Sequence, residues 1–254
     1  MLNNIFDSHA HYDDERFNDD RDELLNSMES KGVCGIIHAS TDIKSAKFGI
    51  EYAQKFQNFY TSIGIHPESV ENLEEDYIKI LKKLAKNKKV VAIGEIGLDY
   101  YWTKETKEKQ LEVFENQLIL AKEFDLPVII HSREATADCM SLLKKYKPKG
   151  VVHCFSGSAE TAKEILSLGM YISFTGVLTF PKSEKAKSAL SVIPIERLLL
   201  ETDSPYMAPV PNRGKRCDSS MICYIAEKVA ELKDIDPQEV LNITTQNVKK
   251  LFKI

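Results

Sequence analysis

Eight short apolar runs rich in β-branched residues recur along the chain, and they constrain its fold more than any other feature. They lie roughly 20 to 36 residues apart, a spacing typical of repeated strand–helix units. The stretches between them carry apolar residues at helical spacing, such as Leu111, Phe114 and Leu118. The predicted strands fall at residues 3–7, 32–40, 59–67, 90–99, 127–133, 150–157, 170–176 and 197–205.

Continuous apolar strands that alternate with helices predict a parallel sheet buried on both faces. Eight such units in 254 residues favour an α/β fold of the closed (β/α)8 TIM barrel type. We expect residues 1–254 to form a single domain, because no linker or low-complexity tract divides the chain. The competing architecture is an open doubly wound sheet, which needs a glycine-rich phosphate loop after an early strand. The first strand here ends in SHAHYDD, which weighs against that alternative.

The net charge of −4 does not predict attraction of the whole protein to nucleic acid. A polyanionic substrate would therefore need a local basic patch or metal ions. The five cysteines form no C-x-x-C pair, so we expect reduced thiols and no structural zinc knuckle. No run approaches the ~18 apolar residues of a membrane helix, and no secretory signal is visible, so we expect a cytoplasmic protein without membrane association. No feature indicates an obligate protein partner.

Two histidines, His9 and His11, stand two residues apart where the first predicted strand ends. Residues at this spacing point to the same side of a strand, so both imidazoles converge. Neutral histidine is the commonest nitrogen ligand for a divalent ion. The pattern also fits an ordinary surface or core pair of histidines. Asp7 shares the same side and could accept a proton from a ligand histidine, which would fix the tautomer of the ring.

Other predicted strands also end in ionisable residues, and this favours the metal interpretation. In a barrel all carboxyl ends of the strands open onto the catalytic face. Of the six histidines in the chain, four fall at such ends. The residues placed at the ends of strands four, five, six and eight are Glu95, His131, His153 and Asp203.

Four histidines and two carboxylates exceed the needs of one tetrahedral ion, so we predict a binuclear site. His9 and His11, with Asp203, would hold one ion. His131 and His153 would hold the second, and Glu95 would bridge the two ions through its oxygens. Of the remaining histidines, His66 could approach substrate or hydrogen-bond a loop, and His38 has the apolar neighbours of a core histidine.

The motifs FDSHAH, GIHP, GEIGLDYYW, PVIIHSR, HCFSG, SFTG and ETDSPYMAPVPNRGKR run from residue 6 to residue 216, and NVKKLF follows near the C-terminus. Together they resemble the TatD family of metal-dependent deoxyribonucleases, within the amidohydrolase-like barrels. The resemblance implies hydrolysis of phosphodiester bonds in DNA, commonly from the 3′ end, with two magnesium or manganese ions. The implied ligands are the six residues selected above by their position at strand ends: His9, His11, Glu95, His131, His153 and Asp203.

The sequence departs from this family at Cys217, Asp218 and Ser219, where relatives usually have Asn-Glu-Pro. This departure puts in doubt the details of the loop after strand eight, and not the metal site.

A mechanism of this kind assigns catalytic roles to Glu95 and Asp203, the second as acceptor of a proton from the attacking water. The basic loop PNRGKR could grip the phosphates of single-stranded DNA or of frayed 3′ ends, or it could be a solvated loop. Aromatic residues after Glu95, namely Tyr100 with Tyr101 and Trp102, could stack on unpaired bases or pack as a lid. The candidate substrate-binding residues are His66, Tyr100, Arg133, Arg213, Lys215 and Arg216.

Two alternatives remain open from the sequence. The first is a metal-dependent hydrolase of another ester or amide on the same barrel, such as an aminoacyl-tRNA deacylase. The second is a metal-binding scaffold without catalysis. The residues do not fix the ion either, because imidazole-rich sites also accept zinc and nickel.

Overall fold

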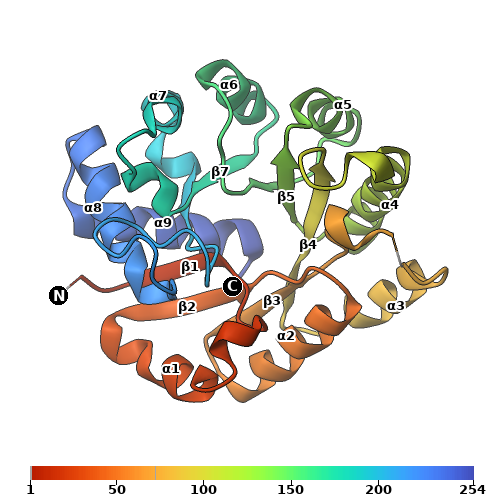
Figure 1. The fold of residues 1–254 in the computed structure, drawn as a ribbon, viewed down its shortest axis with the longest axis horizontal. Helices are drawn as coiled ribbons and strands as arrows, with labels where there is room; N and C mark the ends of the chain where they lie inside the picture. Colours follow the sequence, from red (N-terminus) through yellow and green to blue (C-terminus); the bar gives the residue numbers. More distant parts are fainter. Residues whose placement is uncertain (1, 72) are drawn as a thin grey trace. The chain divides into compact units, whose positions relative to one another are not determined.

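The computed structural model describes residues 2–71 and 73–254, and it contains all eight predicted strands (Figure 1). The first strand extends to Ala10, beyond the predicted end at residue 7, so His9 lies inside it. The strands are β1 (Ile5–Ala10), β2 (Val33–His38), β3 (Phe59–Ile63), β4 (Val90–Asp99), β5 (Val128–Arg133), β6 (Gly150–Val152), β7 (Tyr171–Phe174) and β8 (Leu198–Leu200).

A helix follows each strand, as the alternating pattern predicts. The apolar positions that indicated helices are buried, for example Phe114, Leu118 and Ala121 of α4. Among the helices of the described residues, none is both long and apolar enough to cross a membrane. The helices are α1 (Arg21–Ser27), α2 (Ile43–Lys55), α3 (Tyr77–Leu84), α4 (Lys107–Phe124), α5 (Thr136–Tyr146), α6 (Ala159–Ser167), α7 (Glu184–Val192), α8 (Ile222–Lys233) and α9 (Pro237–Phe252).

The chain divides into two compact units, and the first carries both ends of the strand–helix series. It comprises the residues up to His38 together with Cys154–Ser167 and Tyr171–Ile254. In this unit β1 pairs in parallel with β2, and β7 pairs in parallel with β8. A parallel bridge between Ala10 and Ser204 brings the segment after β8 alongside β1. The last strand of the series is therefore a neighbour of the first, as the (β/α)8 pattern requires.

The second unit comprises Ala39–His153 and Leu168–Met170 and contains β3, β4, β5 and β6 as parallel neighbours in chain order. Figure 1 shows α3, α4 and α5 along one side of these strands. All ten residues of β4 are buried, as expected for a parallel strand covered on both faces. In both units strand neighbours follow chain order, and each strand is followed by a helix.

The prediction that Glu95 ends its strand is wrong, because β4 continues to Asp99. Glu95 lies instead at an irregularity of the strand. Ile93 and Ile96 of β4 pair with Val128 and Ile130 of β5, so β4 has one extra residue over this interval. Gly97 follows with φ of 146°, and a Cβ atom there would lie 1.9 Å from the carbonyl oxygen of His131. Only glycine permits this approach of the two strands.

The additional helix α9 anchors the start of β8 within the first unit. The buried side chain of Asn247 donates hydrogen bonds to the carbonyl oxygens of Ile195 and Leu198, at 2.8 and 2.9 Å. Thr245 of the same helix donates to the carbonyl oxygen of Asn4, just before β1. The C-terminal helix thus satisfies backbone groups at the amino ends of two neighbouring strands.

We expect Asn247→Ala to lower the free energy of unfolding by about 1–3 kcal/mol, because it removes a buried side chain that donates two hydrogen bonds to backbone carbonyl groups. The measurement is the midpoint of urea unfolding followed by circular dichroism. Gln246→Ala is the matched control, since Gln246 is an exposed amide on the same helix. Equal midpoints for the two variants would contradict this role of Asn247.

Candidate metal centre

In the first unit, His9, His11 and Asp203 bring three metal-binding atoms together. The two Nε2 atoms of the histidines lie 3.1 Å apart. The Oδ1 atom of Asp203 lies 3.2 Å from Nε2 of His11 and 3.7 Å from Nε2 of His9. This unit therefore holds the first of the two ligand groups that the sequence predicts.

Backbone hydrogen bonds join the end of β1 to the segment after β8 and so set the position of Asp203. The amide of Asp203 donates to the carbonyl oxygen of His9, and the amide of His11 donates to the carbonyl oxygen of Ser204, at 2.9 and 2.7 Å. Asp203 has a left-handed backbone with φ of 58°. Aspartate is one of the few residue types that adopt this conformation readily.

Asp7 has a different role from the one predicted for it. Its buried carboxylate accepts hydrogen bonds from the amides of His9 and Thr202 and from the hydroxyls of Thr202 and Ser219. The prediction that Asp7 holds the ring of a ligand histidine is wrong, because these donors hold the ends of β1 and β8 together instead. Burial raises the pKa of Asp7 to about 7, in spite of these hydrogen bonds. Ser219, from the segment that departs from the family pattern, is thus part of the support of the site.

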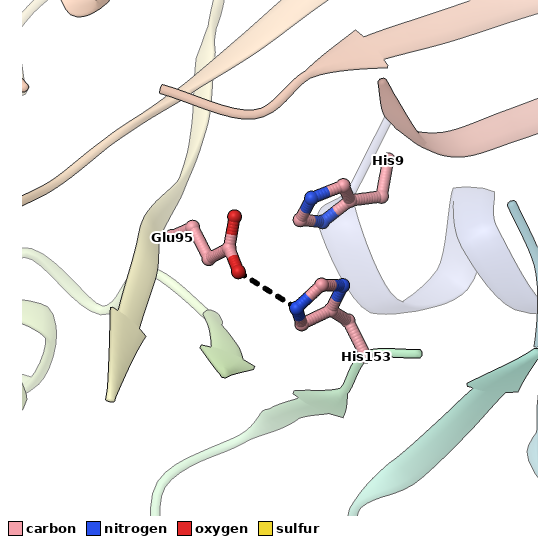
Figure 2. Close-up of side chains that lie close together, drawn as sticks. All are labelled: His9, Glu95 and His153. Carbon is pink, nitrogen blue, oxygen red and sulfur yellow. Dashed lines mark ion pairs between the residues drawn. The ribbon is translucent and has the colours of Figure 1, made fainter. Parts of the chain in front are cut away.

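In the second unit, two histidines converge on the carboxylate of Glu95. Its Oε1 atom lies 2.8 Å from Nδ1 of His131 and 2.7 Å from Nε2 of His153, and Figure 2 marks the second contact. These two nitrogen atoms are 3.3 Å apart. The second group of predicted ligands is thus also assembled, with Glu95 at its centre.

Asp99 is a site residue that the sequence reasoning missed. Its Oδ2 atom lies 2.9 Å from Nε2 of His131, on the side of the ring opposite to Glu95. Burial alone would raise the pKa of Asp99, but its hydrogen bonds with His131, Trp102 and Tyr101 outweigh burial and lower it. A carboxylate at Nε2 keeps a proton there and leaves the lone pair of Nδ1 for a metal ion. The signal was present in the sequence, since Asp99 ends the run GEIGLD on the same side of the strand as Glu95.

The pKa of His131 reflects the same arrangement. Burial lowers this pKa, but the hydrogen bonds to Asp99 and Glu95 outweigh burial, so that the pKa of His131 is raised. His131 is therefore stabilised as a cation between the two carboxylates. A divalent ion at Nδ1 would supply that positive charge in its place.

His66 also lies beside Glu95, and its tautomer follows from its neighbours. Nδ1 of His66 accepts a hydrogen bond from the amide of Glu68, so the proton of the neutral ring is on Nε2. That Nε2 atom is 3.4 Å from Oε1 of Glu95. Burial lowers the pKa of His66, which favours the neutral ring. His66 is thus arranged to donate toward Glu95 rather than to bind an ion.

A second carboxylate that the sequence reasoning passed over is Glu201, which is fully buried. It accepts hydrogen bonds from the amide of Cys154, at 2.6 Å, and from the hydroxyl of Ser173, at 2.7 Å. Cys154 directly follows His153, so Glu201 fixes the chain next to a predicted ligand. The sequence offered only the position of Glu201 at the end of the last apolar run.

Both donor sets fit divalent metal ions. With metal–ligand bonds of ~2.1 Å, neighbouring ligand atoms lie about 3.0–3.4 Å apart in octahedral or tetrahedral geometry. The separations of 3.1 and 3.2 Å around His11 and of 3.3 Å between His131 and His153 fall in this range. The 3.7 Å between His9 and Asp203 is longer, and the contacts of Glu95, at 2.8 and 2.7 Å, are hydrogen-bond distances. Imidazole nitrogen and carboxylate oxygen suit zinc, nickel, manganese and magnesium to different degrees. The residues present can therefore hold the ions that the sequence predicts.

The basic residues of the predicted phosphate-binding loop have different surroundings. Arg216 donates to both carboxylate oxygens of Asp20, at 2.7 and 2.6 Å, so its guanidinium already has an acidic partner. Arg213 and Lys215 are exposed, and the guanidinium of Arg213 lies 4.5 Å from the ring centre of Phe180. Arg213 and Lys215 remain the better candidates for contact with a phosphate.

The aromatic residues after β4 also differ in their exposure to solvent. Tyr100 is half-buried, and its hydroxyl donates to Asp138 at 2.8 Å, which gives it a structural partner. Tyr101 and Trp102 are exposed. Arg133, at the end of β5, is exposed as well and lies against their rings. The exposed rings of Tyr101 and Trp102 are therefore better placed for the substrate-binding role predicted for Tyr100.

Comparison with proteins of known sequence and structure assigns the chain to a family. It is 42% identical to an uncharacterized metal-dependent hydrolase, YabD, from Bacillus subtilis, over 98% of this chain and 99% of that one. It is 32% identical to the 3′-5′ ssDNA/RNA exonuclease TatD from Cronobacter sakazakii, over 98% of this chain and 97% of that one. The crystal structure of YJJV, a TatD homologue from Escherichia coli, superposes with a TM-score of 0.93 at 30% identity and covers 100% of both chains.

A phosphotriesterase homology protein from Escherichia coli, 15% identical with a TM-score of 0.70 over 98% of both chains, shares the fold alone. These structural likenesses confirm the predicted (β/α)8 barrel fold. The sequence pattern of TatD-related DNases matches residues 6–253, nearly the whole chain. The protein therefore belongs to the TatD-related DNase family of metal-dependent hydrolases.

Proposed function

We propose that this protein is a divalent-metal-dependent phosphodiesterase that degrades DNA from the 3′ end. The observation that carries the proposal is the pair of donor groups, one of His9, His11 and Asp203 and one of Glu95, His131 and His153. Each group offers two imidazoles and a carboxylate. Both stand at or near the carboxyl ends of barrel strands, where (β/α)8 enzymes carry their chemistry. We infer that the two groups serve one reaction.

Two divalent ions, magnesium or manganese, would supply Lewis-acid chemistry: they neutralise phosphate oxygens and lower the pKa of bound water. His9, His11 and Asp203 would hold one ion, and His131 and His153 the other, with Glu95 shared between them. Asp203 has a further role. Its carboxylate is partly exposed, with 14% of the side chain accessible, so it can accept a proton from a water that attacks the phosphate.

The residues around the second donor group maintain its protonation states. With an ion bound, Asp99 would keep the proton of His131 on Nε2 and so leave the lone pair of Nδ1 for that ion. His66 directs its Nε2–H toward Oε1 of Glu95. These contacts bring ring nitrogens of His66 and His131 to one oxygen of the carboxylate that we propose as the shared ligand.

Nucleic acid as the substrate class is supported by relatives that are named 3′-5′ ssDNA/RNA exonucleases and by the exposed cations Arg133, Arg213 and Lys215. Each of these side chains can donate to phosphate oxygens. Because the net charge is −4, such local cations and the ions have to supply the attraction. We propose single-stranded DNA, or frayed 3′ ends, as the substrate.

Removal of the metal should abolish hydrolysis of a 3′-labelled single-stranded oligonucleotide, because no residue alone neutralises the phosphate. Adding back magnesium or manganese to the chelated protein should restore shortening from the labelled end. Zinc is added in a separate reaction to compare ions, and an aminoacyl-tRNA and a simple amide serve as alternative substrates. Activity on the ester or amide without any on DNA would overturn the proposal.

Asp203→Asn should reduce turnover on the same oligonucleotide by about 10²–10⁴-fold, because an amide does not accept the proton of the attacking water. Some metal should remain bound, since His9 and His11 are unchanged, and metal content is measured by elemental analysis. Asp234→Asn is the matched control, because Asp234 is an exposed aspartate with φ of 53°. Full activity of the Asp203 variant would refute this role.

Asp99→Asn should weaken manganese binding by about 10–100-fold, since an amide no longer fixes the proton of His131 as a carboxylate does. The side chain keeps an oxygen that can accept from the amides of Tyr101 and Trp102, so the local fold should persist. Calorimetric titration of the chelated protein measures the affinity. Asp138→Asn, a half-exposed carboxylate of the same unit, is the control. Unchanged affinity in the Asp99 variant would show that it does not orient the ligand.

A further inference from the structure

The segment after β4 exposes two large aromatic side chains. Tyr101 is 51% exposed and Trp102 is 58% exposed, and Trp102 is the only tryptophan of the chain. Their rings meet edge to face, with centroids 4.7 Å apart. Exposed large aromatic residues that lie together are unusual on a protein surface unless they bind something.

A cation is held against these rings. The guanidinium carbon of Arg133 lies 4.2 Å from the ring centre of Tyr101 and 5.4 Å from that of Trp102. Among residues 2–71 and 73–254, no carboxylate lies within ion-pair distance of Arg133. Its planar group is thus stacked in place while its hydrogen-bond donors have no acidic partner. An arginine in this state can bind a phosphate with two parallel hydrogen bonds.

Two buried polar side chains hold the backbone of the exposed segment through hydrogen bonds. Oδ1 of Asp99 accepts hydrogen bonds from the amides of Tyr101 and Trp102, at 2.9 and 2.8 Å. The buried side chain of Gln110 accepts a hydrogen bond from the backbone amide of Asp99. It also donates hydrogen bonds to the backbone carbonyl oxygens of Asp99 and Thr103. Asp99 and Gln110 are fully buried. Two buried polar side chains therefore fix the backbone of the aromatic pair, which reduces the ordering cost of binding.

We propose that Tyr101, Trp102 and Arg133 form a subsite for one nucleotide of a single-stranded nucleic acid. The base stacks on the exposed ring of Trp102, and Arg133 donates to an adjoining phosphate. This inference rests on the proposed function and extends it, because it places a substrate contact outside both donor groups. Asp99 links the subsite to the metal centre, since its other oxygen accepts from the ligand His131.

The chemistry of the three side chains favours this occupant over others. A nucleotide offers a flat base that can stack on an aromatic ring and a phosphate that can accept hydrogen bonds from a neighbouring cation. Stacking of this kind does not discriminate among bases. Bases inside a duplex already stack on their neighbours, so the subsite selects unpaired ends. A lid that packs on the protein would bury its rings, whereas both rings here are more than half exposed.

The position of Trp102 allows a direct test. The full-length chelated protein is titrated with a six-nucleotide oligothymidylate and, separately, with a blunt-ended DNA duplex, while tryptophan fluorescence is recorded. We expect saturable quenching by the single strand and none by the duplex. The same titrations are repeated with manganese present in the Asp203→Asn variant, so that binding is also measured with metal and without cleavage. Absence of quenching in both forms would overturn the proposal.

Variants then identify the side chains responsible, with binding measured by anisotropy of a 5′-labelled oligothymidylate. Trp102→Ala should weaken binding by about 5- to 100-fold, and Arg133→Gln should weaken it and reduce its dependence on salt. Ile119→Ala and Lys122→Gln are matched controls, since both side chains are exposed on α4 of the same unit. Equal affinity of the Trp102 variant and its control would refute the subsite.

These results can be separated from the outcome of the nuclease assay. Metal-dependent cleavage with unchanged binding by the Trp102 variant would reject the subsite and leave the proposed function intact. Binding that depends on Trp102, without cleavage by any metal form, would support the subsite and reject the proposed phosphodiesterase.

Discussion

The convergence of two imidazoles on the buried carboxylate of Glu95 is the constraint around which the second unit is arranged. Water is largely excluded from this oxygen, so its charge must be compensated by groups that the fold brings to it. The extra residue in β4 turns Glu95 toward His131 and His153, and Gly97 lets the strand continue so close to β5. A regular strand with a side chain at residue 97 could not combine this contact with the pairing of Asp99 and Arg133.

Buried carboxylates beyond the predicted ligands support both donor groups, each in its own way. Asp7 fastens the ends of β1 and β8 through four hydrogen bonds from three residues. Glu201 holds the chain directly after His153. Asp99 acts on a ring nitrogen of His131 itself. In each case a buried acid accepts hydrogen bonds from several donors, as polar groups out of water require.

The sequence predicted the strands and the ligand candidates because both depend on periodic patterns. The eight apolar runs appear as eight strands, and the four histidines of the donor groups lie in the second half of a strand or just after it. Within the two units, Asp203 lies close to His9 and His11, and Glu95 lies close to His131 and His153. The use of these six residues as ligands of two ions remains a prediction. The position of Glu95 within its strand was missed, because an extra residue in a strand leaves no mark in the hydrophobic pattern.

Contacts between distant segments were the part that sequence reasoning did not reach. Arg216 was expected to meet a phosphate, but it meets Asp20, which is 196 residues away along the chain. Asp7 was expected to touch a histidine ring, but its partners are Thr202 and Ser219. Only the folded structure decides which of several chemically suitable partners a charged side chain finds.

The two oxygens of Asp99 serve different neighbours, one the ring of His131 and the other the backbone of Tyr101 and Trp102. Any displacement of that backbone therefore also displaces the carboxylate beside the ring of His131, a predicted ligand. A nucleotide and an ion bound on the two sides of Asp99, as proposed, would change each other's affinity reciprocally. By whatever factor a seated nucleotide changes the affinity for the ion, the ion changes the affinity for the nucleotide by the same factor.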